Sequence, residues 1–163
     1  MPLVYADPSA LFAYLHPDDE FSGVVDAAVQ KESPDFVHWS FLRCELRHNL
    51  RLARTERHGE VAWQALRAAE KTAARLQWQG ELTADKMLDA AEELSAEKAG
   101  DFDCGSSDYQ HVSAARRLNL LSGLDEFRTC DVAPAALAPS VGLKTRLFKL
   151  KRQASPPGDP PAG

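Results

Sequence analysis

Short apolar runs and helical patterns alternate in the first part of the chain. Residues 3–6 (LVYA) form an apolar run that ends at Asp7, which is typical of a buried strand. Pro8 then suits the first turn of a helix, whose free N–H groups Asp7 can cap. Residues 20–32 carry apolar side chains at helical spacing, and residues 36–39 are a second short apolar run. The pattern predicts strand, helix, helix, strand.

Helix-forming residues dominate the middle of the chain. Three helices are expected there: Phe41 to about Arg57 with Ser40 as its cap, Val61 to Gln79, and Ala84 to Lys98, with breaks at Gly59 and Gly80. In the last part of the chain, the pattern predicts a helix over Ser107–Leu120, with Ser107 and Gln110 in capping-box spacing, and then a strand over Phe127–Cys130. A helix over Pro134–Val141 that ends at Gly142 and an edge strand over Thr145–Leu150 are expected to follow. Strands that alternate with helices indicate the α/β class, with an open and mostly parallel sheet.

Composition and charge narrow the class of protein. The 163 residues, of which 44% are hydrophobic and 26% charged, suffice for one domain with its own core. The three cysteines are an odd number without metal-ligand spacing, which suggests reduced thiols and a cytoplasmic protein. No run approaches the roughly 20 apolar residues of a membrane helix, and the N-terminus lacks the pattern of a signal peptide, so no membrane is expected as a partner. The net charge of -5 argues against nucleic-acid binding through the overall field, so such binding must come from local basic patches.

Four acidic residues fall where a core or a sheet edge is expected. Asp7 and Asp131 each follow a short strand and precede a helix, which places both at the carboxyl edge of a parallel sheet, where α/β folds keep their sites. Glu45 and Asp108 each share a helix face with mainly apolar neighbours. Two unit charges about 4 Å apart repel by about 4 kcal/mol at an effective dielectric constant of about 20, so such a cluster must be protonated, solvated or neutralised. Carboxylate oxygens suit a hard divalent ion, Mg²⁺ or Mn²⁺, and the lack of a Cys/His array argues against structural zinc.

Four stretches resemble the motifs of one known family. The segment VYADPSAL is similar to the first motif of PIN-domain proteins, a hydrophobic strand followed by Asp-x-Ser-Ala-Leu, and FLRCELRHNL to the segment that carries their internal glutamate. The segment SSDYQHVSAARRL resembles their Asp-x-x-His-x-x-Ala-Ala helix, and FRTCDVAPAALAPSVGLK their Phe-x-Thr-x-Asp strand with the alanine-rich helix and Gly-Leu that follow it. The four stretches occur in family order over residues 3–150. Within the family, the chain is most similar to VapC-type toxins of bacterial toxin-antitoxin operons.

This resemblance implies a three-layer α/β/α fold and a metal-dependent endoribonuclease that hydrolyses RNA phosphodiester bonds. It implies an acidic quartet that is both catalytic and the ligand set for Mg²⁺ or Mn²⁺, with two hydroxyl residues in support. The quartet is Asp7, Glu45, Asp108 and Asp131, and the supporting residues are Ser9 and Thr129. The resemblance also implies a homodimer and a cognate antitoxin as protein partners, in addition to the RNA substrate.

The expected domain covers residues 1–152, and a disordered proline-rich tail is expected over 153–163. Within the domain, residues 59–98 form a helical excursion that is longer than in a minimal family member. Its apolar side chains exceed what a two-helix flap can hide, so it either covers the core or forms a lid, a dimer surface or an antitoxin groove. Pro8, which follows the first aspartate, is a second departure from the family pattern.

Each acidic residue also has a purely structural interpretation. An aspartate after a strand is often only a helix cap, and Glu45 can pair with an arginine across the core. Asp101 and Asp103 can add a ligand but are expected in a solvated loop. His111 is expected to be a buried, hydrogen-bonded histidine rather than a ligand or a base.

A basic stripe follows the expected helix over 41–57: Arg43, Arg47, Arg51 and Arg54. Arg43 and Arg47 are candidates for guiding the RNA backbone towards the acidic residues. The alternatives are a solvated helix face, or a surface that meets acidic groups of a partner. The pair Arg116-Arg117 and the segment LKTRLFKLKR are similar candidates.

Other functional classes remain as alternatives. A PIN-fold module that binds RNA or protein without turnover does not need an intact quartet. A haloacid-dehalogenase-like phosphatase needs two aspartates two positions apart after the first strand, and position 9 is serine. A phospho-acceptor receiver domain needs a lysine after a late strand together with an acidic pair, and the chain matches that pattern poorly.

Overall fold

The computed structural model describes residues 1–55, 57–72, 76–79 and 83–150. In chain order its elements are β1 (Leu3–Ala6), α1 (Pro8–Leu15), α2 (Ser22–Glu32), β2 (Asp35–Trp39), α3 (Ser40–Leu52), the 3₁₀ turn η1 (Ala53–Thr55), α4 (Gly59–Thr72), β3 (Leu76–Gln79), α5 (Ala84–Lys98), α6 (Ser106–Ser122), β4 (Glu126–Thr129), α7 (Val132–Leu137), the 3₁₀ turn η2 (Ala138–Val141) and β5 (Thr145–Leu147). Within these residues, no helix combines the length and the apolar character needed to cross a membrane.

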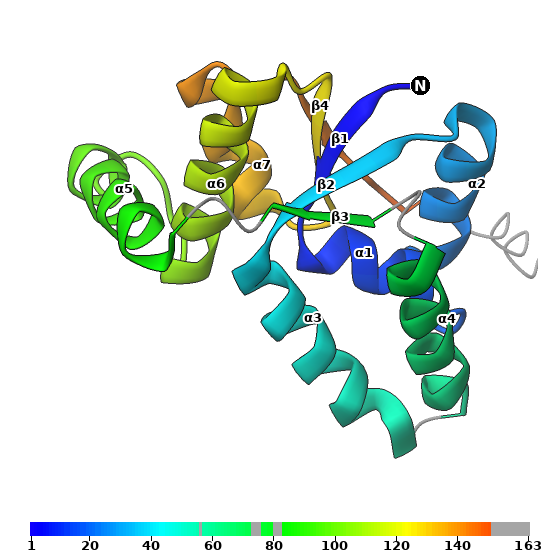
Figure 1. Ribbon diagram of the computed structural model, residues 1–163. Helices are drawn as coiled ribbons and strands as arrows, with labels where there is room; N and C mark the ends of the chain where they lie inside the picture. Colours follow the sequence, from blue (N-terminus) through cyan, green and yellow to red (C-terminus); the bar gives the residue numbers. More distant parts are fainter. Residues whose placement is uncertain (56, 73–75, 80–82, 151–163) are drawn as a thin grey trace, which may run out of the picture.

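The strands form one parallel sheet in the order β3-β2-β1-β4-β5 (Figure 1). In its register, Val4 of the central strand β1 pairs with Phe36 of β2 on one side and with Glu126 of β4 on the other. Helices cover both faces of the sheet. The predicted α/β class, with three α/β/α layers and a parallel sheet, is therefore confirmed.

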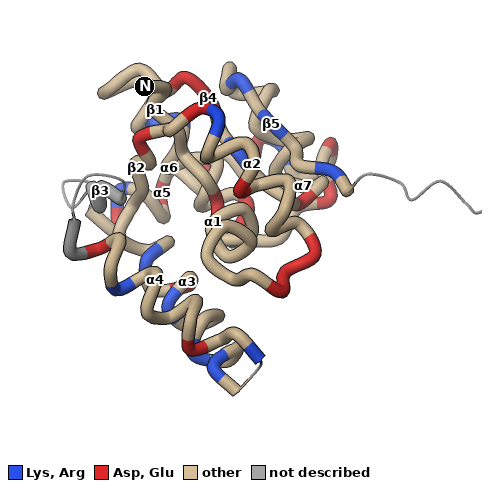
Figure 2. The backbone as a smooth tube through the Cα atoms, turned by 90° about the vertical axis from the view of Figure 1, so that its right-hand side faces the viewer, with Lys and Arg blue, Asp and Glu red and all other residues tan. Residues whose placement is uncertain are grey.

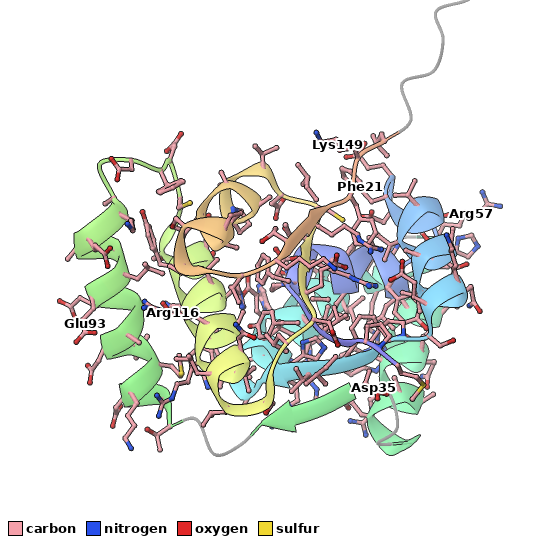
Figure 3. The ribbon with its side chains drawn as sticks, turned by 90° about the horizontal axis from the view of Figure 1, so that it is seen from above. Phe21, Asp35, Arg57, Glu93, Arg116 and Lys149 are labelled. Carbon is pink, nitrogen blue, oxygen red and sulfur yellow. The ribbon has the colours of Figure 1, made fainter. Side chains whose placement is uncertain are left out.

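The path of the chain decides which helices cover which face. The chain adds β2 and β3 on one side of β1, and then returns to add β4 and β5 on the other side. Right-handed crossovers therefore place α1 to α4 on one face and α5 to α7 on the opposite face, in agreement with the contacts among these helices. Figure 3 shows α5 as the outermost helix of its layer, with Glu93 pointing away from the sheet. The connections that follow β1 and β4 leave towards opposite faces of the sheet. The carboxyl ends of these two strands therefore flank the switch point, where open α/β folds bind ligands.

The core forms where the strands and the helices present apolar side chains to each other. Val4 and Tyr5 of β1 are fully buried, as expected for a central parallel strand that is covered on both faces. On α3, Leu42, Leu46 and Leu50 recur at a spacing of four residues and are also fully buried. Each such leucine contributes about 1.5–3 kcal/mol relative to an exposed side chain, so this stripe fixes α3 against the sheet.

The prediction of a single helix over Val61–Gln79 is wrong at its C-terminal end. α4 ends at Thr72, and residues 76–79 form the edge strand β3, which pairs with residues 36–39 of β2. The sequence LQWQ alternates apolar and polar residues, which is the strand period, and the open edge of β2 supplies hydrogen bonds that outweigh local helix propensity. Residues 59–98 are therefore not a purely helical excursion, because their strand extends the central sheet.

Two predicted helix caps are also wrong. Ser40 is the first helical residue of α3 and makes no capping hydrogen bond with its side chain, and the expected last turns up to Arg57 are replaced by η1. α6 begins after Gly105, so Ser107 lies inside the helix and does not cap it. Instead, Asp108 reaches back and accepts a hydrogen bond from the Gly105 N–H at 2.8 Å.

The C-terminal elements lie close to their predicted positions. The helix expected over 134–141 begins at Val132, and its last turn is η2. Gly142 ends it with a φ of 81°, a left-handed conformation that glycine adopts without steric cost. The predicted edge strand over 145–150 is shorter and ends at Leu147.

Most of the described apolar side chains of residues 59–98 lie in the core. Leu66, Met87 and Leu94 are buried, whereas 47% of Leu88 is exposed. These three side chains therefore help to cover the core. The expected break at Gly80 and the expected disordered tail over 153–163 lie outside the described residues.

Candidate functional site

Asp7 lies at the carboxyl end of β1 and caps α1. Its backbone N–H donates to the carbonyl of Arg128 in β4 at 2.9 Å, which extends the ladder between the two strands. Its Oδ1 atom accepts hydrogen bonds from the Ser9 hydroxyl at 2.7 Å and from the Ala10 N–H at 3.0 Å. Only 3% of Asp7 is exposed. Asp7 is thus a helix cap, as its structural interpretation proposes, but its charge is buried.

Burial also dominates the electrostatics of Asp7. It raises the pKa of the carboxyl from 3.8 to about 6. Hydrogen bonds from Thr129, Ser9 and Ala10 lower this pKa, but these effects are smaller than that of burial. Keeping Asp7 ionised therefore destabilises the folded protein, and a nearby cation would reduce this destabilisation.

Asp131 follows the carboxyl end of β4, the strand that pairs with β1, at whose end Asp7 lies. Its backbone N–H donates to Oγ1 of Thr129 at 2.9 Å, and the N–H of Cys130 donates to Oγ of Ser9 at 2.9 Å. The side chain of Asp131 makes no capping hydrogen bond to α7, so the helix-cap interpretation does not apply to it. Ser9 donates to Asp7 and accepts from Cys130, and it therefore ties the two strand ends together.

The carboxylate of Asp131 interacts with other acidic groups. Burial raises its pKa, and the negative charges of Asp108 and Asp19 raise it further. Asp131 is nevertheless an exposed residue. Its carboxylate is thus open to a ligand from solvent in a region of negative potential.

Glu45 pairs with a histidine and not with the arginine that its structural interpretation proposes. It is half-buried on α3, and its Oε2 atom lies 2.8 Å from Nε2 of His111 on α6. Nδ1 of His111 lies 3.0 Å from the hydroxyl of Tyr5. His111 is buried, as predicted for a hydrogen-bonded histidine. Burial raises the pKa of Tyr5 well above 10.0, and the charges of Asp7 and Glu45 raise it further.

A cleft of about 450 Å³ brings several of the predicted residues together, between α1, the α1–α2 connection, α3 and the end of β4. Ser9, Glu45 and Asp131 line it. Asp7 adjoins the cleft through its hydrogen bond with Ser9. Asp108 is not one of the lining residues, and its carboxylate is held by the Gly105 N–H. No lysine or arginine occurs in the described lining, so the cleft is acidic.

Two further acidic residues of the cleft were not predicted. Asp19 and Glu20 lie in the α1–α2 connection and line the cleft next to Phe21, whose N–H donates to Asp19 at 2.8 Å. The signal in the sequence is the acidic run from 18 to 20, which follows the first predicted helix. Cys130 also lines the cleft, and burial, followed by the charges of neighbouring aspartates, raises the pKa of its thiol to about 12.

Other acidic candidates lie apart from the cleft. Asp101 and Asp103 are exposed in the connection between α5 and α6, as predicted for a solvated loop. Neither residue lines the cleft.

The donor chemistry of the cleft suits a hard divalent ion, although its arrangement is incomplete. Within the described part of the chain, no group of three or more His, Cys, Asp or Glu side chains is placed to hold a metal ion. Asp7 and Asp131 offer oxygen ligands from adjacent strand ends, which Mg²⁺ and Mn²⁺ prefer. Glu45 and Asp108 each use one carboxylate oxygen for a hydrogen bond, Oε2 with His111 and Oδ2 with the Gly105 N–H, so the other oxygen of each is the potential ligand.

The arginine stripe of α3 meets acidic and aromatic side chains of α4. Arg47 makes two hydrogen bonds to Glu70, from Nε at 2.9 Å and from Nη2 at 2.6 Å. The guanidinium groups of Arg51 and Arg54 lie over the ring of Trp63, at 5.4 and 5.8 Å from its centroid. Figure 2 shows Lys and Arg positions spread along α3 and α4. The acidic group that Arg47 meets thus belongs to the same chain.

Comparison with known proteins supports the fold. No family model matches the chain, and a search of curated proteins finds no match. Among solved structures, the chain is similar to a domain of a functionally unknown protein from Methanocaldococcus jannaschii DSM 2661, with a TM-score of 0.54 and 15% sequence identity over 98% of this chain and 100% of that chain. At that identity, the likeness concerns the three-layer architecture alone.

Proposed function

We propose that the chain is a metal-dependent endoribonuclease of the PIN-domain kind, acting as the VapC-type toxin of a toxin-antitoxin pair. The observation that carries the proposal is the buried carboxylate of Asp7 at the switch point of the sheet, beside a cleft lined by further acidic side chains. Such a cleft repels the RNA backbone unless cations neutralise it. This arrangement favours phosphodiester hydrolysis with Mg²⁺ or Mn²⁺ over RNA binding by basic side chains within the cleft.

In this proposal, Asp7 and Asp131 are the principal metal ligands from the two strand ends. The Ser9 hydroxyl keeps Asp7 in place, as its hydrogen bond of 2.7 Å indicates. Glu45 and Asp108 complete the set, directly or through water, and orient the attacking water. When bound, Mg²⁺ or Mn²⁺ supplies neutralisation of the phosphate charge and acidifies a bound water.

An RNA cleavage assay tests the activity. The purified chain is incubated with RNA in Mg²⁺, in Mn²⁺ and in EDTA, alongside Asp7→Asn and the control Asp26→Asn, whose side chain is exposed on α2. We expect metal-dependent cleavage by the wild type and by Asp26→Asn, and none by Asp7→Asn. Cleavage that persists in Asp7→Asn would contradict the assignment of the site, and a wild type that is inactive with both metals would contradict the enzyme.

A second candidate function is a PIN-fold module that binds RNA or protein without turnover. The observation that favours it is that, in the part of the chain that the structure describes, no group of three or more His, Cys, Asp or Glu side chains is placed to hold a metal ion. Calorimetric titration with MgCl₂ and MnCl₂ separates the two functions. Metal binding supports the nuclease, whereas RNA binding without metal binding or cleavage supports the module.

The basic residues of α3 remain candidates for the RNA path. We propose that Arg43 and Arg47 guide the RNA backbone, with Arg47 exchanging its bond to Glu70 for one to phosphate. Replacing either arginine by alanine is then expected to weaken RNA binding and to reduce its salt dependence. Binding that barely changes between low and moderate salt would exclude both residues from this role.

The partner proposals follow from the same family resemblance. A homodimer and a cognate antitoxin are proposed as partners, and the cytoplasm as the compartment. Size-exclusion chromatography with light scattering at micromolar concentration tests the dimer, and a clean monomer would contradict it. A small open reading frame immediately upstream that encodes a DNA-binding protein would support the antitoxin.

A further inference from the structure

We propose that Tyr5 is a positioning residue for the acidic cleft, which fixes the side chain of Glu45 through the ring of His111. The three residues form what we call the Tyr5–His111–Glu45 relay. The role of Glu45 rests on the proposed function, whereas the relay itself rests on two hydrogen bonds that link three elements of the fold.

The relay runs from the centre of the sheet to the cleft. The hydroxyl of Tyr5 on β1 lies 3.0 Å from Nδ1 of His111 on α6, and Nε2 of His111 lies 2.8 Å from Oε2 of Glu45 on α3. Tyr5 is 0% exposed and His111 is 3% exposed, whereas 30% of the Glu45 side chain is accessible. A buried phenol therefore contacts, through one ring, a carboxylate that lines the cleft.

The hydrogen-bonding capacity of the three groups assigns the protons of the relay. The Tyr5 hydroxyl is protonated at neutral pH, and within the described residues its hydrogen-bond partner is Nδ1 of His111. If the hydroxyl donates to Nδ1, a neutral ring carries its proton on Nε2, which then donates to the Glu45 carboxylate. This assignment satisfies every group of the relay, and Tyr5 thereby selects the ring tautomer that holds Glu45.

Tyr5 is itself held firmly in the core. Its ring stacks on Phe127 of β4 at a centroid distance of 5.8 Å and an interplanar angle of 11°, and it makes a T-shaped contact with the ring of His38 at a centroid distance of 5.6 Å. Burial lowers the pKa of His38 to about 3, so this neighbour is neutral. The hydroxyl therefore has a fixed direction, and the His111 ring takes its orientation from it.

The relay also couples two of the proposed ligands. Tyr5 and Asp7 are two positions apart at the end of β1, so both depend on the same strand, while Glu45 stands on a helix of one layer and His111 on a helix of the other. The relay therefore bridges the two helical layers at the carboxyl edge and sets Glu45 relative to Asp7. Replacing a residue that hydrogen-bonds directly to a metal ligand, as His111 does to Glu45, typically changes metal affinity or activity by about 10–100-fold.

The test measures the tautomer of the His111 ring and the affinity for Mn²⁺ in separate experiments. NMR of the chain with ¹⁵N-labelled histidine, in EDTA, reports which ring nitrogen of His111 carries the proton, and His111→Gln identifies its signals among the five histidines. We expect the Nε2–H form in the wild type. Tyr5→Phe is expected to lose this preference and to bind MnCl₂ more weakly by calorimetry, by up to about 10-fold, because Tyr5 acts on Glu45 through His111.

Tyr109→Phe is the matched control. Tyr109 is a buried tyrosine on the same helix as His111, and its hydroxyl has no hydrogen-bond partner within the described residues. Its replacement is expected to leave the His111 signals and the Mn²⁺ affinity unchanged. His111→Gln keeps a donor near the Nε2 position and is expected to retain more Mn²⁺ affinity than His111→Ala.

The outcomes distinguish the relay from the proposed function. A wild-type ring protonated on Nδ1 overturns the relay without any variant, and so does a Tyr5→Phe chain with unchanged ring signals and Mn²⁺ affinity. A wild type that neither binds Mn²⁺ nor cleaves RNA overturns the proposed function, and the NMR measurement still decides the relay. If Tyr5→Phe does not fold, the wild-type tautomer and the comparison of the two His111 variants decide it.

Discussion

Replacing Asp7 by asparagine is expected to stabilise the metal-free protein, although the substitution removes a charge from a cap. Burial raises the pKa of Asp7 in the folded chain to about 6, from an ordinary value of 3.8. Each pH unit of this difference corresponds to about 1.4 kcal/mol, so keeping Asp7 ionised in the folded protein costs about 3 kcal/mol at pH 7. Asparagine keeps an oxygen that accepts from the Ser9 hydroxyl and the Ala10 N–H, and it carries no charge.

The sign of the pH dependence follows from the raised pKa. The folded chain binds the Asp7 proton more tightly than the unfolded chain, so the contribution of Asp7 to stability falls as the pH rises from about 4 to about 6 and stays low above that. The gain from Asp7→Asn is therefore expected to be small at pH 4 and to reach about 3 kcal/mol at pH 7. Urea unfolding in EDTA, followed by the fluorescence of tryptophans such as the buried Trp39, measures this difference at both pH values.

Asp26→Asn is the control for this experiment, because Asp26 is exposed on α2 and its replacement is expected to change stability little at either pH. The reasoning would be refuted by an Asp7→Asn chain that is less stable than the wild type at pH 7, or by a gain that does not depend on pH. Added MgCl₂ is expected to stabilise the wild type and not Asp7→Asn, because the proposed metal site needs the Asp7 carboxylate.

Two further substitutions test how the fold supports the site. Arg128→Met is expected to lower the free energy of unfolding in urea by roughly 3 kcal/mol, because Arg128 is 2% exposed and its Nε bonds to the buried Glu126 at 2.7 Å. A loss below about 1 kcal/mol would show that this buried pair contributes little. Gly59→Ala is expected to lower the melting temperature through a loss of about 1–3 kcal/mol or more, because the new Cβ would lie 1.8 Å from the carbonyl oxygen of Ala53. Gly23→Ala is the matched change in open space, at the second residue of α2, and is expected to stabilise by at most about 1 kcal/mol. Equal effects of the two glycine variants would contradict the predicted clash.

The strand ends were predictable because their signals are local. A short apolar run followed by Asp7 and Pro8 specifies a strand and the start of a helix within a few residues. Asp131 also lies between a short predicted strand and a predicted helix, although the strand before it contains charged residues. The edge strand β3 was not predicted, because its helix-forming neighbours masked an alternation only four residues long. That strand depends on the open edge of β2, whose position is decided by the whole sheet.

The partners of the acidic residues could not be predicted for a similar reason. Glu45 and His111 are 66 positions apart and meet across the carboxyl edge of the sheet, a contact that no spacing in the sequence encodes. Arg47 forms part of a visible basic stripe, but the glutamate that it bonds belongs to the next helix. Asp19 enters the cleft from a helix connection that has no periodic pattern. Sequence patterns thus locate candidate residues, whereas the tertiary fold decides what each one meets.

The magnitudes help to decide whether Asp7 is only a helix cap. A capping side chain contributes about 1 kcal/mol, and asparagine or serine caps about as well as aspartate. Keeping the Asp7 carboxylate ionised costs about 3 kcal/mol at pH 7, and this cost remains after the hydrogen bonds from Ser9 and Ala10 have lowered its pKa. A cap alone therefore accounts for the hydrogen bond to Ala10 but not for a charge at this buried position. A bound cation accounts for both, because it lowers the pKa of the carboxyl and turns the cost of its charge into binding free energy.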